Sequence, residues 1–405
     1  MRRRRPLPPE DALARVVLER YLTLRAGESL TVESWSHALP WARSFVVEAR
    51  RRGAVPTLVV EDEEAYFRSL ELAGAPVASG PARSPLVPAS AHVYLGGPDA
   101  FARLLGLPAE EIDRIARRHE VSWWRRAGRY RTRAVRLAVA DATPSAAARY
   151  GVDLHAWRSE LVRASRVDPR RLEAIGARVS HRLGSARSLR VRHPNGTDLL
   201  LRRRRSPPSL DTGRPRPTAG HLWARVPSGL LIVPLEPRVA EGTWETNRPA
   251  YDRFADPPVA LGGWFEFRGG RLREFTFERG GDRFAAAYAS GGRRSGRPLA
   301  LTVGLNPEVV RAPEVLELAA GTVGLLLGDG QPSRPPGSGI GFLAALGGAS
   351  VDADGRPWIV DGALPGTNGA GRKARPGRIR PRASSRTLAP WSGHGQDSAR
   401  RSARR

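Results

Sequence analysis

The sequence predicts an α/β N-terminal domain with a mostly parallel, doubly wound sheet, then an α+β, β-rich C-terminal domain and a disordered basic tail. Three observations predict this order. Helical and strand periodicities alternate through residues 10–130, which is typical of βαβ units. Short strands divided by Gly and Pro dominate residues 181–365. Residues 366–405 are rich in Arg, Gly, Ser and Pro and show no periodicity.

Helices and strands follow one another in the first domain. Apolar residues recur at helical spacing over 11–22, and a second helix is expected over 39–51. Alternating apolar residues predict a strand at 29–35. The run VPTLVVED, residues 55–62, is continuously apolar, and such a run suits a parallel strand that is covered on both faces. Residues 90–97 are expected to form a further strand.

His37 follows the strand at 29–35, at the edge where α/β sheets place ligands. Two interpretations stay open for it, a residue that lines a site and an ordinary loop histidine. The glycines of this domain form no phosphate-binding fingerprint, because Gly27 precedes its strand rather than following one.

Residues 131–180 are expected to form a helical connection, in which Thr143 and Pro144 mark a helix start. A β-hairpin follows, with Asn195 and Gly196 in its turn. In the C-terminal domain, five apolar residues are spaced as the inner face of a meander, while the arginines between them also resemble a base-stacking platform. The five residues are Phe265, Phe267, Leu272, Phe275 and Phe277.

Basic residues are concentrated at the two ends of the chain, which carries a net charge of +26 over 405 residues. Residues 1–9 are expected to be a disordered basic N-terminus, and residues 366–405 hold eleven basic residues and one acid. Nucleic-acid contact through the basic tail is one interpretation. A general bias toward arginine is the other, since only Lys373 among the 66 basic residues is lysine.

Composition excludes several kinds of site. Cysteine is absent, so any metal must be held by His, Asp or Glu. No apolar run approaches the roughly 20 residues needed to cross a bilayer, and the first residues lack the apolar stretch of a secretory signal. We therefore expect a cytoplasmic protein without membrane contact. Ser228 lies outside any Gly-x-Ser-x-Gly elbow, so no nucleophile triad is indicated.

Eight segments in a fixed order resemble the thermophilic-type metallo-aminopeptidases, the aminopeptidase T and S family. They span approximately residues 10–365, and their order and spacing together carry the resemblance. The segments are YLTLRAGESLTVES, RSFVVEARRRGAVPTLVVED, ATPSAAARYGVD, VRHPNGTDLLL, VPSGLLIVPLEPRVAEGT, VGLNPEV, AAGTVGLLLGDG and VDADGRPWIVDG.

The resemblance implies a two-domain homodimer whose C-terminal domain uses two divalent metal ions to remove N-terminal residues from peptides. At the positions that match the family's ligands, however, donor groups are missing. Leu230 and Ala300 replace two glutamates, Gly324 replaces a histidine, and Gly341 and Leu343 replace the closing His-x-Asp. These side chains cannot coordinate a cation. The same losses exclude the His/His/Asp iron site of the related dihydroxypyridine dioxygenases.

We therefore expect a divergent member without metal ligands, catalytic residues or a resident cofactor, whose pocket at these five positions takes a peptide or a small molecule. Asp329 is the candidate for a residual polar site, against an ordinary turn aspartate, and the glycines at 337, 339 and 341 are a candidate anion nest. A rebuilt metal site would draw on Glu236, Glu241, Glu245, Glu266 and Asp361. Two alternatives stay open, an active metal-dependent aminopeptidase with displaced ligands and a nucleic-acid-associated protein that uses the basic tail.

Overall fold

The structure is a computed structural model, and its described residues all belong to one compact unit, Met1–Asn368. Residues 1–7 and 367–405 lie outside the described residues, so the expected disorder of both basic ends and the nucleic-acid contact stay predictions. The structure describes residues 8–68, 89–99, 130–216, 222–248, 251–252, 260–281, 284–285, 288–289, 296–328 and 341–366.

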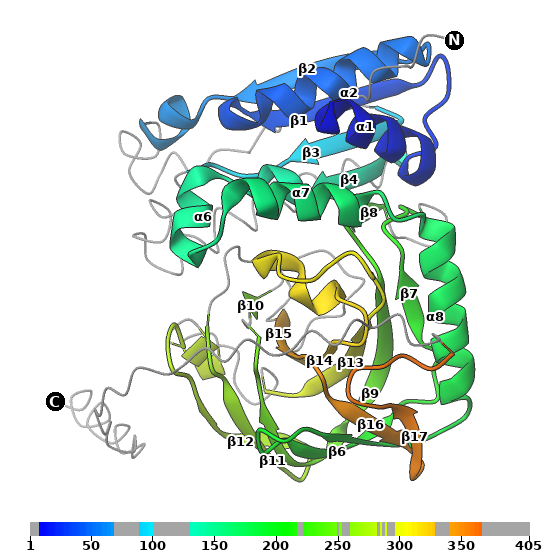
Figure 1. The fold of residues 1–405 in the computed structure, drawn as a ribbon, viewed down its shortest axis with the longest axis vertical. Coiled ribbons are helices and arrows are strands. Elements are labelled where there is room, and N and C mark those ends of the chain that lie inside the picture. Colours follow the sequence, from blue (N-terminus) through cyan, green and yellow to red (C-terminus); the bar gives the residue numbers. More distant parts are fainter. Residues whose placement is uncertain are drawn as a thin grey trace, which may run out of the picture. The chain divides into compact units, whose positions relative to one another are not determined.

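A five-stranded parallel sheet forms the N-terminal part of the fold, in the order β2-β1-β3-β4-β8 (Figure 1). The chain passes from β1 outward to β2 and then returns to the other side of β1 for β3, so the strand order reverses between β1 and β3. This confirms the α/β class of the first domain and its parallel sheet. The strands are β1 (Ser29–Trp35), β2 (Val55–Glu61), β3 (Ala91–Leu95), β4 (Arg133–Leu137) and β8 (Trp223–Val226).

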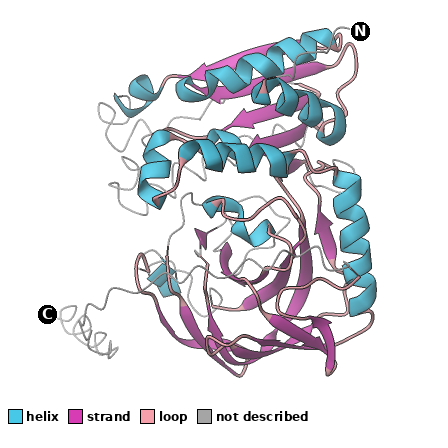
Figure 2. Cartoon of the chain, in the orientation of Figure 1, coloured by secondary structure: helices cyan, strands magenta, loops and turns pink. Residues whose placement is uncertain are grey.

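One face of this sheet packs against helices (Figure 2). Val32 on β1, Val93 on β3 and Val135 on β4 are fully buried in one cluster with Leu13 and Phe45 from the helices. No helix in the described part of the chain is long and apolar enough to cross a membrane. The helices between the N-terminus and the first strand of the larger sheet include α1 (Pro9–Val16), the π-helix η1 (Val17–Tyr21), the 3-10 helix η2 (Ser36–Ala38), α2 (Leu39–Arg51), the 3-10 helix η3 (Ala138–Ala140), α6 (Pro144–Tyr150), α7 (Leu154–Ser165) and α8 (Pro169–Leu183).

The opposite face of the sheet is polar, because the strand register aligns polar residues across it. Glu33 pairs with Tyr94, Tyr94 with Arg136, and Arg136 with Arg225. His92 on the same face is 1% exposed, and its Nε2 lies 3.2 Å from Glu33 Oε2. Alternation of apolar and polar residues along β1, β3 and β4 therefore separates an apolar core from a buried layer of hydrogen-bonding groups.

The expectation that strand 55–62 is covered on both faces is wrong. β2 is the last strand of the sheet order, and Val55, Leu58 and Val60 are 62%, 39% and 44% exposed. A continuous apolar run fits a central parallel strand, but the run alone does not show where in the sheet the strand lies. Here the strand is at the edge, and its apolar side chains face solvent.

Two strands of the first sheet come from outside residues 10–130. β4 lies in the stretch expected to be a helical connection, and β8 lies in the stretch assigned to the C-terminal domain. Both are short, and β4 is followed directly by a 3-10 helix. Thr143 begins α6 as expected, since its Oγ1 accepts a hydrogen bond from the N–H of Ala146 at 3.2 Å.

A twelve-stranded sheet forms the C-terminal part, with the path β10-β15-β14-β13-β9-β6-β5-β16-β17. The predicted hairpin is confirmed, because β5 and β6 pair antiparallel around the turn that holds Asn195 and Gly196. The meander is also present as the β11–β12 pair, with Phe265 and Phe267 fully buried. The strands of the twelve-stranded sheet are β5 (Ser188–Arg192), β6 (Asp198–Arg203), β7 (Ser209–Asp211), β9 (Leu230–Glu245), β10 (Tyr251–Asp252), β11 (Trp264–Arg268), β12 (Arg271–Thr276), β13 (Pro298–Gly304), β14 (Val323–Gly328), β15 (Gly341–Leu346), β16 (Ser350–Ala353) and β17 (Arg356–Ile359).

Candidate functional site

The five positions that the resemblance matches to metal ligands all lie on one face of the antiparallel sheet. Leu230 pairs with Gly304 across β9 and β13, and Ala300 pairs with Leu326 across β13 and β14. Leu326 in turn pairs with Leu343 on β15. Because cross-strand partners share a face and alternate residues return to it, positions 324 and 341 lie on this face as well. The fold thus brings together residues that are distant in sequence, and we call them the substituted face.

Hydrocarbon fills the substituted face. Leu230, Ala300 and Leu343 are 2%, 1% and 1% exposed and belong to one hydrophobic cluster with helix residues of the first domain. Of the β9, β13, β14 and β15 residues whose side chains share this face near those positions, Thr302 alone carries a side-chain oxygen. Its hydroxyl donates to the Gly324 carbonyl oxygen at 3.3 Å.

A side chain at Gly324 would collide with two neighbouring side chains as they are packed in this structure. A Cβ added there would lie 2.5 Å from Thr302 Oγ1 and 2.9 Å from Leu343 Cδ1. The neighbouring side chains therefore occupy the space into which a histidine at this position would project. The residues at the five positions fit no divalent cation, because their side chains offer no donor atoms.

No group of three or more His, Asp or Glu side chains that could hold a metal is found within the described ranges. The carboxylates of the same domain have other partners. Glu236 contacts Arg187 at 2.6 Å, Glu266 contacts Arg268 at 2.7 Å, and Asp361 accepts from the Ser350 hydroxyl at 3.0 Å. Asp329 and the glycines at 337 and 339 lie outside the described residues, so the residual polar site and the anion nest stay predictions.

The segment that follows β13 covers the substituted face and is held by buried polar groups. The 3-10 helix η6 (Pro313–Leu318) contacts β13 and β15. Ahead of it, Glu160 Oε1 on α7 accepts three backbone N–H groups, which come from residues 310, 311 and 312 at 2.7, 2.8 and 2.8 Å. Asn306 Nδ2 donates to the carbonyl oxygens of Ala164 at 3.1 Å and Ser228 at 2.8 Å. These bonds tie the covering segment to α7 and to the start of β9.

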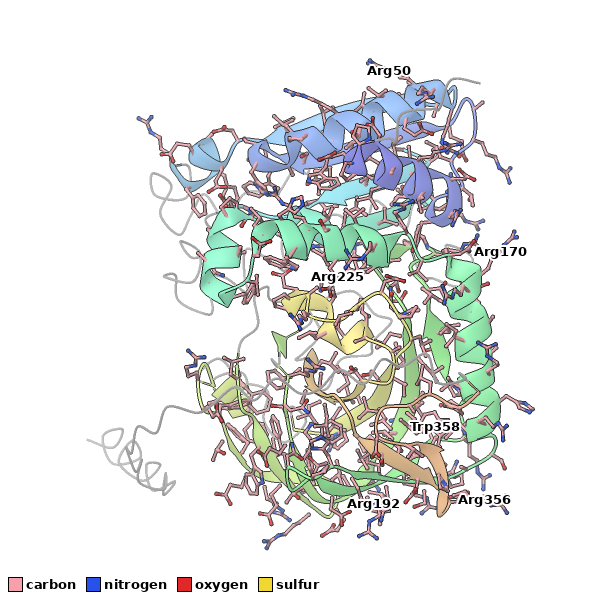
Figure 3. The ribbon with its side chains drawn as sticks, in the orientation of Figure 1. Arg50, Arg170, Arg192, Arg225, Arg356 and Trp358 are labelled. Carbon is pink, nitrogen blue, oxygen red and sulfur yellow. The ribbon has the colours of Figure 1, made fainter. Side chains whose placement is uncertain are left out.

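An ion-pair network connects η6 to the parallel sheet. Arg225 is labelled in Figure 3. Its Nη2 lies 3.8 Å from Asp141 Oδ2 and 3.7 Å from Glu314 Oε2. Arg136 lies 3.2 Å from Asp141, and the Tyr150 hydroxyl donates to Glu314 Oε1 at 3.3 Å. Glu314 is buried, so its charge requires these partners.

A second polar cluster lies at the carboxyl ends of β1 and β3, where the strand order reverses. His37 Nε2 donates to the Ala140 carbonyl oxygen at 3.1 Å. Ser145 Oγ donates to Asp99 Oδ1 at 2.6 Å. Burial alone would raise the pKa of Asp99, but hydrogen bonds from Ser145 and Thr143 and the nearby charge of His37 hold it below its usual range. The cluster stabilises an ionised Asp99, and both interpretations of His37 stand.

Sequence reasoning missed Glu160, Asn306 and Arg225. One signal was present for Glu160, because it lies three residues after Trp157 and four before Ala164 on the buried side of α7. A charged residue on an apolar helical face indicates a buried partner. Arg225 carried no comparable signal in a chain that is rich in arginine.

No family model and no curated protein matches the chain. Solved structures do match. Wild-type AmpT from Thermus thermophilus is 17% identical with a TM-score of 0.63, covering 88% of this chain and 98% of its own. The 2,5-dihydroxypyridine dioxygenase of Pseudomonas putida KT2440 is 13% identical with a TM-score of 0.53, covering 90% of this chain and 99% of its own. The chain therefore shares the fold of these proteins over most of its length.

Proposed function

We propose that this chain is a non-catalytic or repurposed homologue of the aminopeptidase T fold, which binds a peptide or small molecule rather than hydrolysing it. One observation carries the proposal: the position that matches a ligand histidine, Gly324, is packed so closely that an added Cβ would lie less than 3.0 Å from Thr302 Oγ1 and Leu343 Cδ1. The other four matching positions are hydrocarbon or glycine on the same buried face.

The chemistry of a two-metal hydrolase requires several oxygen or imidazole donors that converge from separate strands. In this chain the corresponding strands contribute leucine, alanine and glycine. Hydrocarbon side chains also disfavour a cation by removing it from water without replacing its ligands. A change at one position would remove one ligand, whereas these five changes leave none of the matched donors.

Hydrolysis of leucine and alanine anilides tests the loss of activity. Purified full-length protein is assayed with cobalt, zinc or manganese, and AmpT from Thermus thermophilus is assayed alongside it. We expect no release of the chromophore above the uncatalysed rate with any of these metals. Hydrolysis that a metal stimulates and a chelator abolishes would instead establish the alternative, an active aminopeptidase with displaced ligands.

The binding half of the proposal is supported by the likeness of fold. A ligand that binds the native state raises the unfolding midpoint as its concentration rises. We therefore expect short peptides or amino-acid amides to raise the midpoint of the wild type. The Gly324→Ala and Gly97→Ala variants should both keep this response, because the substituted face is filled by its own side chains and the ligand would bind outside it. A wild type whose midpoint no peptide or amide raises would contradict the binding half of the proposal.

A further inference from the structure

Helix α8 presents a row of arginines to solvent. Arg170, Arg171, Arg178 and Arg182 are exposed, while the opposite side of the helix is buried in the hydrophobic core of the larger sheet. At 3.6 residues per turn, Arg171, Arg178 and Arg182 lie within about 40° of one another around the helix axis, and they span about 16 Å along it. Arg170 projects away from α8 beside the start of this row (Figure 3). We refer to these four residues as the α8 row.

The charge of the α8 row is not neutralised within the described part of the chain. None of its four arginines forms an ion pair or a side-chain hydrogen bond with another described residue. Glu173 is the one carboxylate on α8, and it lies 3.2 Å from Arg216, outside the row. On the next strand, β5, an exposed arginine is paired instead, since Arg190 Nη2 lies 2.6 Å from Asp198 Oδ2.

Two further arginines continue this basic surface past the C-terminal end of α8. Arg203 Nη1 donates to the Gly184 carbonyl oxygen at 2.7 Å, so β6 ends beside the end of the helix. The next residues, Arg204 and Arg205, are exposed, and neither side chain pairs with a described carboxylate. The positive surface therefore extends beyond the helix itself.

Helix stability does not account for the α8 row. The N-terminal end of a helix carries a partial positive charge, which favours acids and disfavours arginines in the first turn. Arg170 and Arg171 lie in the first turn of α8, which contains no acid. The N-cap, Asp168, is an acid, but an arginine of η1 lies 3.6 Å from its carboxylate. Among the described α-helices, α8 alone has arginine in its first turn. Two charges that oppose the helix dipole indicate a role in binding rather than in folding.

We propose that the α8 row binds the phosphate backbone of a nucleic-acid duplex without reading its sequence. Guanidinium groups pair with phosphates through two parallel hydrogen bonds. A duplex carries one negative charge per roughly 1.7 Å of its axis, so a row of about 16 Å faces several phosphates at once. A ligand with a single phosphate or carboxylate would reach only part of the row.

The remaining surface of α8 disfavours other large anionic partners. Between residues 154 and 199, no large apolar side chain is exposed. Protein interfaces and membrane-surface helices use aromatic or aliphatic anchors, and single-stranded nucleic acids stack on aromatic side chains. The exposed positions between the arginines include Ala174 and Ala177, which provide neither kind of anchor. Contact with duplex phosphates requires no such anchor.

Fluorescence anisotropy of the full-length protein with DNA and RNA duplexes of about 20 base pairs tests the surface, starting at about 50 mM salt. The double variant Arg171→Gln with Arg178→Gln should lower the affinity at least about tenfold. Each phosphate contact contributes about 0.9 to the salt slope, so the slope should fall by about 1.8. The tighter of the two duplexes identifies the type of nucleic acid.

The matched control is Arg43→Gln with Arg50→Gln on α2. These two arginines are also exposed, seven residues apart and without a described ion pair, so the net charge changes by the same amount. The control should bind both duplexes as the wild type does. Equal losses in the two double variants would overturn the proposal, because binding would then come from overall charge or from the basic tail. A wild type that binds neither duplex would overturn it as well.

Two further measurements separate a lost phosphate contact from a disturbed helix and from membrane binding. Arg171→Lys with Arg178→Lys keeps both charges and should keep the wild-type salt slope. A lysine variant that loses the slope as the glutamine variant does would contradict phosphate contact. Flotation with phosphatidylserine vesicles should show no difference between the wild type and the glutamine variant. If the glutamine variant loses vesicle binding and keeps duplex binding, the surface belongs to a membrane and the proposal is wrong.

Discussion

Leu343 Cδ1 lies 2.9 Å from the point that a Cβ on Gly324 would occupy. The two residues belong to adjacent strands, β15 and β14, and both are among the five positions that the resemblance matches to metal ligands. The two residues are therefore coupled by packing, because Leu343 occupies space that a Cβ on Gly324 would need. This coupling argues that the substituted face is a repacked core rather than a metal site missing single ligands.

Gly324→Ala should destabilise the protein although glycine is usually unfavourable in a strand. The added methyl group would collide with Thr302 Oγ1 and Leu343 Cδ1, and overpacking of this kind costs about 1–3 kcal/mol. Urea unfolding measures the change in the free energy of unfolding. Gly97→Ala is the matched control, since its Cβ meets no atom within 4 Å, and it should change stability by less than about 0.5 kcal/mol. Equal effects of the two variants would refute the packing argument.

Glu160→Ala should be among the most destabilising changes of a charged residue. The variant leaves three N–H groups without their acceptor, of which that of Ala312 is buried, and this costs about 2–4 kcal/mol. Glu160→Gln keeps a carbonyl acceptor and should cost less. Glu308→Ala removes an exposed carboxylate that lies 3.9 Å from Arg163, and it should cost at most about 1 kcal/mol. The prediction fails if the Glu160 and Glu308 alanine variants unfold at the same urea concentration.

Asp99 should contribute stability that depends on pH. Its folded-state pKa lies below its unfolded value, so the contribution is present above the unfolded pKa of about 3.9 and is lost as the pH falls through the folded value. The wild type should therefore be more stable than Asp99→Asn at pH 7, with a smaller difference near pH 3. Ser145→Ala removes a hydrogen bond to the carboxylate, so at pH 7 its free energy of unfolding should lie closer to that of Asp99→Asn than the wild-type value does. If the free energies of unfolding of wild type and Asp99→Asn differ by the same amount at pH 3 and at pH 7, the cluster does not stabilise an ionised Asp99.

Local patterns were enough to predict the class of the fold and several elements. Helix starts such as Thr143-Pro144 and the Asn195-Gly196 turn depend on neighbouring residues, which the sequence displays directly. The membership of β4 and β8 in the first sheet depends on long-range pairing. The exposure of β2 depends on its place in the strand order, which no local pattern encodes.

The candidate site was predictable in part. The resemblance placed five positions together, and the structure puts all five on one buried face. Their packing was not predictable, because the distance between Gly324 and Leu343 depends on the register of β14 and β15. The Glu160 and Asn306 contacts were missed for the same reason, since each joins residues that are more than 70 positions apart.

The metal content of the purified full-length protein tests the central claim most directly. The protein is incubated with cobalt, zinc and manganese, freed of loose ions by gel filtration and measured by elemental analysis. If the substituted face holds no cation, the bound metal should stay well below one ion per chain and should not differ between wild type and Gly324→Ala. Two tightly held divalent ions per chain, removed only by a chelator, would contradict the account.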